Sequence, residues 1–139
     1  MANESLNSIA EAYIAKLKEA FPDLEVEHYP DNVASYNLGH HKAAILVVYQ
    51  NRTFKEGQNS DGSGQVNHPV FQITYVTRSL IAKKKSPGIY DLLDTGREAL
   101  KELDFEQSKA SIINEGFLDI KKGGVWMFGQ QWKHTDYFE

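Results

Sequence analysis

The chain has 139 residues, a formal net charge of −4 and no cysteine. A chain of this length is usually one domain and can bury roughly 68% of its unfolded surface, so its core needs no disulfide or metal. The lack of cysteine excludes disulfides, thiolate nucleophiles and cysteine metal sites. The acidic charge argues against a general nucleic-acid binder, which needs a basic face for phosphates. We therefore expect one domain over residues 1–139.

No segment predicts a membrane or secretory destination. The longest apolar run, Ala43–Tyr49, is too short to span a bilayer. The first residues, MANESLNS, lack a basic segment followed by an apolar one, so no secretory signal is expected. These features predict a protein that is kept in a cytoplasm and has no membrane partner.

The first predicted element is an amphipathic helix, and a short strand follows it. Apolar residues recur at steps of three and four from Leu6 to Phe21. Asn3 or Ser5 is the candidate cap. Residues 24–28 alternate between the two faces of an extended chain, which predicts a half-exposed strand.

A buried strand, a polar loop and a long strand are predicted next. Ala43–Tyr49 is apolar on both faces, which is typical of a central strand covered on both sides. Gln50–Pro69 is polar and aperiodic, and we expect a loop there. An alternating strand is predicted from Val70 onward. One of its faces carries Phe71, Ile73, Tyr75 and Thr77.

A second helix and three short strands complete the prediction. Ser86 is the candidate cap and Pro87 suits the first helical position, before apolar residues recur at helical spacing over 89–103. Strands are expected at 110–113, 116–120 and 125–132, the last two joined by a turn at 121–124, with HTDYFE as a frayed tail. The element order is then αβββαβββ, an α+β fold.

No motif predicts catalysis, a cofactor or a metal site. The segment NSDGSG lacks the oxygen pattern of a calcium loop, and the glycines form neither a P-loop nor a dinucleotide fingerprint. The GxSxG and HExxH motifs are absent. Five histidines show no metal-ligand spacing: His28, His40, His41, His68 and His134. We expect no catalytic, cofactor-binding or metal-binding residue.

Two groups of residues remain as candidates for contacts. The first is an aromatic group near the C-terminus, for which core and interface are equally compatible, because Trp and Tyr are enriched at contact sites. It comprises Trp126, Phe128, Trp132, Tyr137 and Phe138. The second is a pair of basic turns, which more often serve only to keep a turn soluble. They comprise Lys83, Lys84, Lys85, Lys121 and Lys122.

Several segments resemble the Mu-type phage minor tail proteins of the tail-terminator class. The matching segments are AYIAKLKEAFPDLEVEHYP, AAILVVY, HPVFQITYVTRSL and SPGIYDLLDTGREAL. The most specific part is a strand ending in Arg-Ser-Leu, followed by Gly-x-Tyr-x-Leu-Leu and a helix ending in Ala-Leu. The segment GGVWMFGQQWKHTDYF is similar to the closing strands of that family. The chain departs from the pattern at Lys42, where the family often has proline, and in its polar segment 57–64.

This resemblance implies a mixed, mainly antiparallel sheet with two amphipathic helices packed on one face. It also implies a structural protein that needs no cofactor and assembles with itself into a six-fold ring. The ring would cap the tail tube protein, contact head–tail connector proteins and reside in the virion tail after assembly in the host cytoplasm. The basic turns would then line a lumen through which DNA passes without specific binding.

Two other functions are compatible with the residues alone. A monomeric adaptor or assembly chaperone would bind a peptide strand at a sheet edge. A small enzyme would instead use His28, His68 and nearby carboxylates in a convergent, partly buried cluster.

Overall fold

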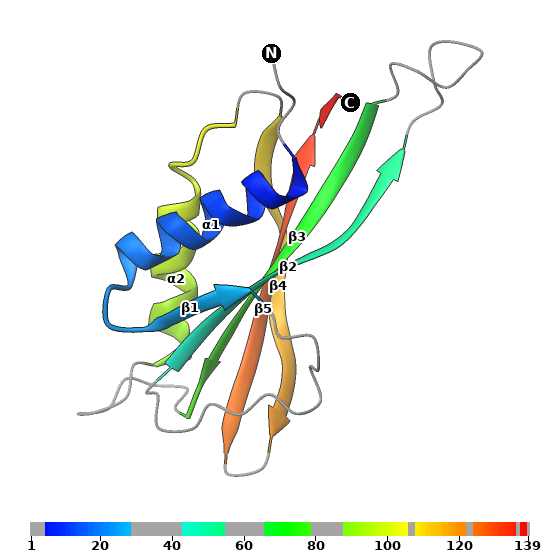
Figure 1. Ribbon diagram of the computed structural model, residues 1–139. Helices are drawn as coiled ribbons and strands as arrows, with labels where there is room; N and C mark the ends of the chain where they lie inside the picture. Colours follow the sequence, from blue (N-terminus) through cyan, green and yellow to red (C-terminus); the bar gives the residue numbers. More distant parts are fainter. Residues whose placement is uncertain are drawn as a thin grey trace.

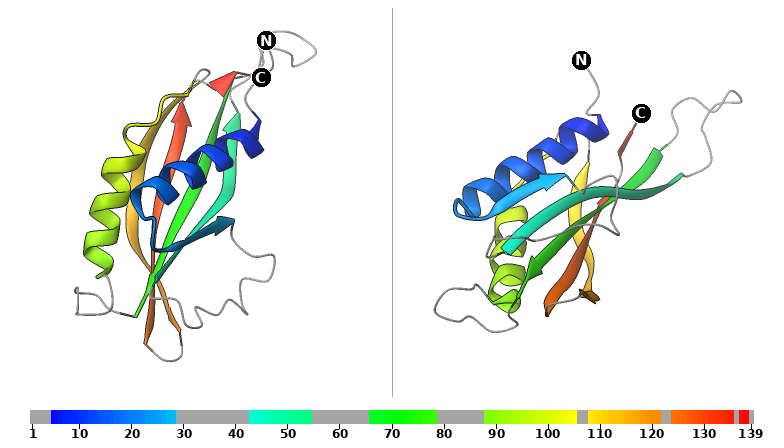
Figure 2. Two further views of the ribbon diagram at one scale, coloured as in Figure 1. Left: turned by 60° about the vertical axis from the view of Figure 1, so that its left-hand side comes forward. Right: turned by 60° about the horizontal axis from the view of Figure 1, so that its bottom comes forward.

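Two helices lie on the same face of a twisted sheet (Figures 1 and 2). The computed structural model describes residues 5–28, 43–54, 66–78, 88–105, 108–121, 124–135 and 137–138. The helices are α1 (Leu6–Ala20) and α2 (Ile89–Leu100). The strands are β1 (Glu25–His28), β2 (Ala43–Phe54), β3 (Val66–Thr77), β4 (Lys109–Lys121), β5 (Val125–Thr135) and β6 (Tyr137–Phe138).

The sheet is mixed and mainly antiparallel. Its strands follow the order β1-β2-β3-β5-β4, and β6 pairs with β3 beside this path. Only β1 and β2 run parallel among these pairs; β2–β3, β3–β5, β4–β5 and β3–β6 are antiparallel. The expected α+β fold, with both helices on one face, is confirmed, and the element order of the described residues is αβββαβββ.

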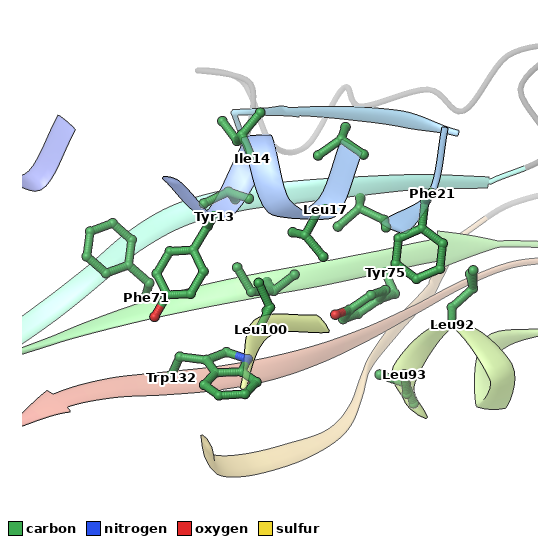
Figure 3. Close-up of a cluster of buried hydrophobic side chains, with 14 of the residues drawn as sticks. Tyr13, Ile14, Leu17, Phe21, Phe71, Tyr75, Leu92, Leu93, Leu100 and Trp132 are labelled. Atoms are coloured by element: carbon green, nitrogen blue, oxygen red, sulfur yellow. The ribbon is translucent and has the colours of Figure 1, made fainter. Parts of the chain in front are cut away.

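The main core lies between the helices and the sheet (Figure 3). Because side chains alternate along a strand, Phe71, Ile73 and Tyr75 of β3 all point toward the helices, as the period-two pattern predicts. Side chains from both helices and from β2 and β5 meet them there, and all are buried: Ile9, Tyr13, Leu17, Leu92, Leu100, Ile45, Val47 and Trp132.

A second, smaller cluster lies on the opposite face of the sheet. It contains Ala44, Leu46, Val76, Val125 and Met127, all buried. Since Ile45 and Val47 belong to the main core, the first half of β2 is covered on both faces, which confirms its prediction as a doubly buried strand.

The predicted N-terminal cap is confirmed for α1 and is wrong for α2. Ser5 caps α1: the Ser8 amide donates to its hydroxyl at 3.1 Å, and the Ser5 amide donates to the Ser8 hydroxyl at 3.0 Å. The cap of α2 is Gly88 and the helix begins at Ile89, so the predicted cap Ser86 is wrong. Asp91 in the first turn supplies the negative charge that favours a helix N-terminus.

Several strands are longer than the sequence predicts. β2 continues to Phe54 and β3 begins at Val66, so part of the predicted loop 50–69 belongs to strands. The two expected strands at 110–113 and 116–120 are one strand, β4, whose pairing with β5 shifts register twice. Part of the expected frayed tail forms β6.

Candidate functional site

The outer strand β4 carries four of the six large hydrophobic side chains that are exposed among the described residues. It is thirteen residues long and ends the strand order on its side of the sheet. Four of its side chains form what we call the apolar strip, which extends over both faces of this edge: Ile113, Phe117, Leu118 and Ile120, with exposed fractions of 52, 54, 45 and 47%. Phe117 lies over Phe128 on the face that the helices cover, whereas Leu118 lies over Gly129 on the opposite face. An edge strand with unpaired backbone groups and exposed apolar side chains favours pairing with another chain.

Two β-bulges create the strip. The pairing of β4 with β5 shifts between Ile112 and Asn114 and again between Phe117 and Asp119. Each shift inserts one extra residue, Ile113 or Leu118, and such an insertion redirects neighbouring side chains. The bulges therefore prevent a strict alternation of buried and exposed residues, and apolar side chains emerge where the alternation breaks.

The strip rests on aromatic residues of β5. The Phe117 ring lies edge-to-face with Phe128 at 5.7 Å and with Trp126 at 6.0 Å between ring centroids. Leu118 lies over Gly129, where an added Cβ atom would come within 2.8 Å of the leucine Cδ1. The absence of a side chain at Gly129 thus makes room for Leu118.

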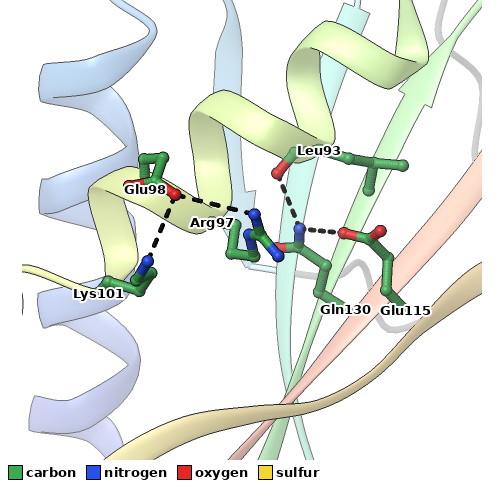
Figure 4. A network of polar contacts seen from close by, with 6 residues as sticks. All are labelled: Leu93, Arg97, Glu98, Lys101, Glu115 and Gln130. Atoms are coloured by element: carbon green, nitrogen blue, oxygen red, sulfur yellow. Dashed lines mark hydrogen bonds and ion pairs between the residues drawn. The ribbon is translucent and has the colours of Figure 1, made fainter.

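A buried glutamine ties this edge of the sheet to α2 (Figure 4). The Gln130 side-chain amide donates to the Leu93 carbonyl at 2.9 Å and to the Glu115 carboxylate at 2.8 Å. Its carbonyl accepts from the Tyr75 hydroxyl at 2.8 Å. Burial, and secondarily the charge of Glu115, raise the pKa of Tyr75 above its usual range, so its hydroxyl stays a proton donor. This network fixes β4 and β5 against the helix.

A basic hollow lies between α2 and β4. It has a volume of about 380 Å³ and is lined by Arg97, Lys101, Ala110, Ser111, Ile112 and Trp132. Arg97 also borders an adjoining hollow that reaches Ile113 in the apolar strip. Glu98 lies 3.8 Å from the Arg97 guanidinium and 3.4 Å from the Lys101 ammonium, so two cations share one anion.

An acidic hollow lies between α2 and the segment that follows α1. It has a volume of about 370 Å³, and its lining is mainly apolar with two carboxylates. The lining residues are Ala20, Phe21, Pro22, Asp23, Leu24, Asp91, Leu92 and Thr95.

The predicted aromatic contact residues divide between surface and core. Trp126 and Phe128 are half-buried beneath the apolar strip, whereas Trp132 is 1% exposed and packs in the main core. Tyr137 and Phe138 form β6, which pairs with the beginning of β3. The side chain of Trp132 therefore belongs to the interior of the single chain, and the interface role of this group stays a prediction.

The predicted basic turns lie largely outside the described residues. Only Lys121 is described, half-buried at the end of β4; Lys83, Lys84, Lys85 and Lys122 are outside the described ranges. Their predicted position in a lumen stays a prediction.

The described histidines lie apart and serve different contacts. His28 lies 2.8 Å from Glu11 at the surface, while buried His134 lies between the Tyr13 and Ser108 hydroxyls. Among the described residues no group of three or more His, Cys, Asp or Glu side chains could hold a metal ion. Within the same ranges, no helix is long and apolar enough to cross a membrane.

Sequence reasoning missed the apolar strip. The signal was present in SIINEGFLDI, where paired apolar residues stand among polar ones without a period of two. If that segment is interpreted as two short strands separated by a break, its apolar side chains are not assigned to one surface.

Comparisons with known proteins complete this description. One solved chain, from the virion of a native gene transfer agent particle, is similar with 12% identity and a TM-score of 0.41, covering 86% of this chain and 82% of that chain. No curated protein matched significantly. The family model described as "Gp37 protein" matches residues 13–132. Since that match spans most of its length, the chain belongs to the Gp37 protein family.

Proposed function

We propose that the chain is a structural component of a phage or prophage virion, and specifically a tail terminator that caps the tail tube as a ring. Two facts support this proposal. Segments over most of the chain resemble Mu-type tail terminators, and the fold that this resemblance implies matches the structure. The observation that carries the proposal is the apolar strip on β4.

The strip is difficult to reconcile with a chain that works alone. Edge strands of monomeric proteins are usually short or protected by charges, prolines or covering segments. β4 is long, its lysines Lys109 and Lys121 stand at its two ends, and exposed apolar side chains outnumber the two carboxylates, Glu115 and Asp119, in residues 112–120. Burying these side chains against a partner removes apolar surface from water, which is the main driving force of association.

A ring fits this surface if successive copies use two different patches. Head-to-tail contacts close into a ring when the rotation between copies permits it. A six-fold ring of this kind would sit on the tail tube protein and offer its other side to head–tail connector proteins. DNA would pass through the lumen, with the basic turns facing it.

The proposal is tested by light scattering of the purified chain over a concentration series, followed by electron microscopy of any large species. We expect rings of one size. The Phe117→Ser variant should lose them while it stays folded at a modest cost in unfolding free energy, because half of that side chain is exposed and the rest packs on Phe128 and Trp126. Tyr49→Ser, at an exposed aromatic residue of β2, is the matched control and should still assemble. Assembly of Phe117→Ser at wild-type concentrations would contradict the proposal.

The same edge favours one other function, a monomeric adaptor or assembly chaperone that binds a peptide strand along β4. This function predicts a strict monomer at every concentration, together with saturable binding of an extended peptide. Phe117→Ser would then weaken peptide binding and leave the molecular mass unchanged.

A further inference from the structure

We propose that copies of this chain join into one continuous sheet, with β4 of one copy pairing antiparallel to β1 of the next. The inference rests on the proposed function in one respect, because the partner is a second copy of this chain. It goes further by assigning the second surface, the direction of the paired strands and their register.

The apolar strip exposes side chains on both faces of β4. Phe117 lies on the face that the helices cover, over Phe128, whereas Leu118 lies on the opposite face, over Gly129. A partner that packs against one face of the sheet covers only one of these two exposed side chains. A strand added beside β4 lies next to both, and it also pairs the backbone groups of the outer edge. Exposure on both faces therefore favours strand addition.

The second surface is the other end of the strand order. Among the described residues β1 pairs with β2 alone, so its outer edge is unpaired there. A contact between β4 of one copy and β1 of the next joins two different edges and can repeat from copy to copy, which a ring requires. A symmetric contact between two β4 strands would stop at a dimer.

The strand directions within one copy determine how the two edges meet. β1 runs parallel to β2, and the pairs β2–β3, β3–β5 and β4–β5 are antiparallel, so β1 and β4 run in opposite directions. Rotation about an axis along the strands keeps these directions and keeps the helices of every copy on the same side of the sheet. Successive copies related in this way bring β1 antiparallel to β4.

Matching the faces of the two strands gives the register. Val26 packs in the main core and His28 lies 2.8 Å from Glu11 of α1, so both side chains point to the side of the helices. Phe117 and Glu115 of β4 point to the same side. Opposed residues of an antiparallel pair share a face, so Val26 lies beside Phe117 and His28 beside Glu115. The first pair is apolar, and the second sets an imidazole beside a carboxylate.

The two bulges limit where a strand can pair with β4. Residues 114–117 lie between the bulges, and β1 has the same length, four residues. A shift of the register by two residues would leave Phe117 uncovered and set Val26 beside the carboxylate of Glu115. Because bulges disrupt regular pairing, this edge rejects long regular strands and accepts a short one.

Disulfide trapping tests the assigned register. In that register Glu27 lies directly opposite Gly116, and the natural chain has no cysteine that could react instead. Both sites have room for the change, because Glu27 is exposed and a Cβ atom at Gly116 meets nothing within 4 Å. Under oxidation Glu27→Cys/Gly116→Cys should give a ladder of linked copies, since opposed residues of paired strands lie close enough for a disulfide.

The control moves one of the two thiols along the same face of β4. Ser111 opposes Lys133 while Gly116 opposes Gly129, so the two sites share a face, and they lie roughly 15 Å apart along the strand. Glu27→Cys/Ser111→Cys should therefore stay unlinked, as should each single-cysteine variant. Circular dichroism of every variant checks that folding is retained.

Hydrogen–deuterium exchange of the natural chain gives a readout that needs no substitution. An added strand brings the outward amides of β1 and of residues 114–117 into hydrogen bonds. Exchange of both segments should slow by roughly tenfold or more in the assembled protein relative to dilute protein. Packing of a partner on one face of the sheet would bury side chains without slowing exchange at both edges.

The outcomes separate this contact from the proposed function. A ladder from Glu27→Cys/Gly116→Cys alone, together with slowed exchange at both edges, supports the contact. Rings without that ladder or without slowed exchange, or linked dimers of Gly116→Cys by itself, would overturn the contact between β1 and β4 while leaving ring formation intact. A chain that stays monomeric in light scattering and gives no ladder would overturn both.

Discussion

The hydroxyl of Tyr75 occupies the space that a side chain on Gly96 would take. A Cβ atom built on Gly96 would overlap the hydroxyl and ring of Tyr75, which is fully buried. The tyrosine cannot easily withdraw, because its hydroxyl donates to Gln130 at 2.8 Å. This close approach brings α2 against β3.

The first prediction follows from this contact. Gly96→Ala should destabilise the fold by about 1–3 kcal/mol, because overpacking a rigid core costs more than the better helix propensity of alanine returns. Denaturant unfolding measures the change. Gly116→Ala is the matched control, since a Cβ atom there meets nothing within 4 Å, and it should be nearly neutral. Equal stability of the two variants would show that the Tyr75 side chain can move aside at little cost in free energy.

A second prediction concerns the glutamine beneath the strip. Gln130→Leu keeps a similar volume but removes the acceptor of Tyr75 and the donor to the Leu93 carbonyl. Leaving these buried groups without partners should cost about 2–4 kcal/mol in unfolding free energy. Glu115→Gln, which retains a hydrogen-bond acceptor at the exposed end of the network, is the control and should cost much less. A Gln130→Leu variant as stable as wild type would contradict the role assigned to the network.

The helices and the central strands could be predicted from the sequence because their burial is periodic. The first helix shows steps of three and four from Leu6 to Leu17. In β3 the large apolar residues Phe71, Ile73 and Tyr75 alternate with smaller or polar ones, so the pattern predicts the face that packs on the helices, although the opposite face is also buried at Val76. The cap of α2 was missed because Gly88 makes no side-chain hydrogen bond, and the hydroxyl of Ser86 is the more usual signal.

The apolar strip and the basic hollow could not be predicted from the sequence, because the burial of β4 is not periodic. β4 is mostly exposed and contains two bulges, so its residues carry neither a period of two nor a period of 3.6. Nor does sequence show that Arg97 and Ile112 line one hollow, because only the pairing of β4 with β5 brings them together. Surfaces made by non-local pairing leave no local pattern to find.

The third prediction concerns acid stability. His134 is buried, with its Nε2 atom 2.7 Å from the Tyr13 hydroxyl and its Nδ1 atom 2.9 Å from the Ser108 hydroxyl, and so links α1 to the strands. Burial lowers the pKa of His134 from 6.5 to about 4. Since the unfolded chain then takes up the proton first, stability is fully present above pH 6.5 and is lost as the pH falls toward about 4.

A pKa difference of this size corresponds to about 3 kcal/mol of lost stability across that range. Replacing the titrating group in His134→Gln should flatten the pH dependence of unfolding between pH 6.5 and about 4. The control is His28→Gln, at an exposed histidine, which should leave the loss of stability at acid pH unchanged. If His134→Gln kept the wild-type pH dependence, other groups would be responsible for the loss of stability at acid pH.

The last prediction uses Gly129 to move the apolar strip without changing its composition. A Cβ atom at Gly129 would displace Leu118, but the contact is with the flexible end of that side chain, so Gly129→Ala should cost no more than about 1 kcal/mol in unfolding free energy. Self-association should weaken clearly, because Leu118 is displaced from its position over Gly129 at the edge that the partner copy contacts. Unfolding curves and light scattering of one sample measure both effects. Adding Leu118→Ala should remove the small stability cost without restoring association. Unchanged association in Gly129→Ala would show that the position of Leu118 does not matter to the contact between copies.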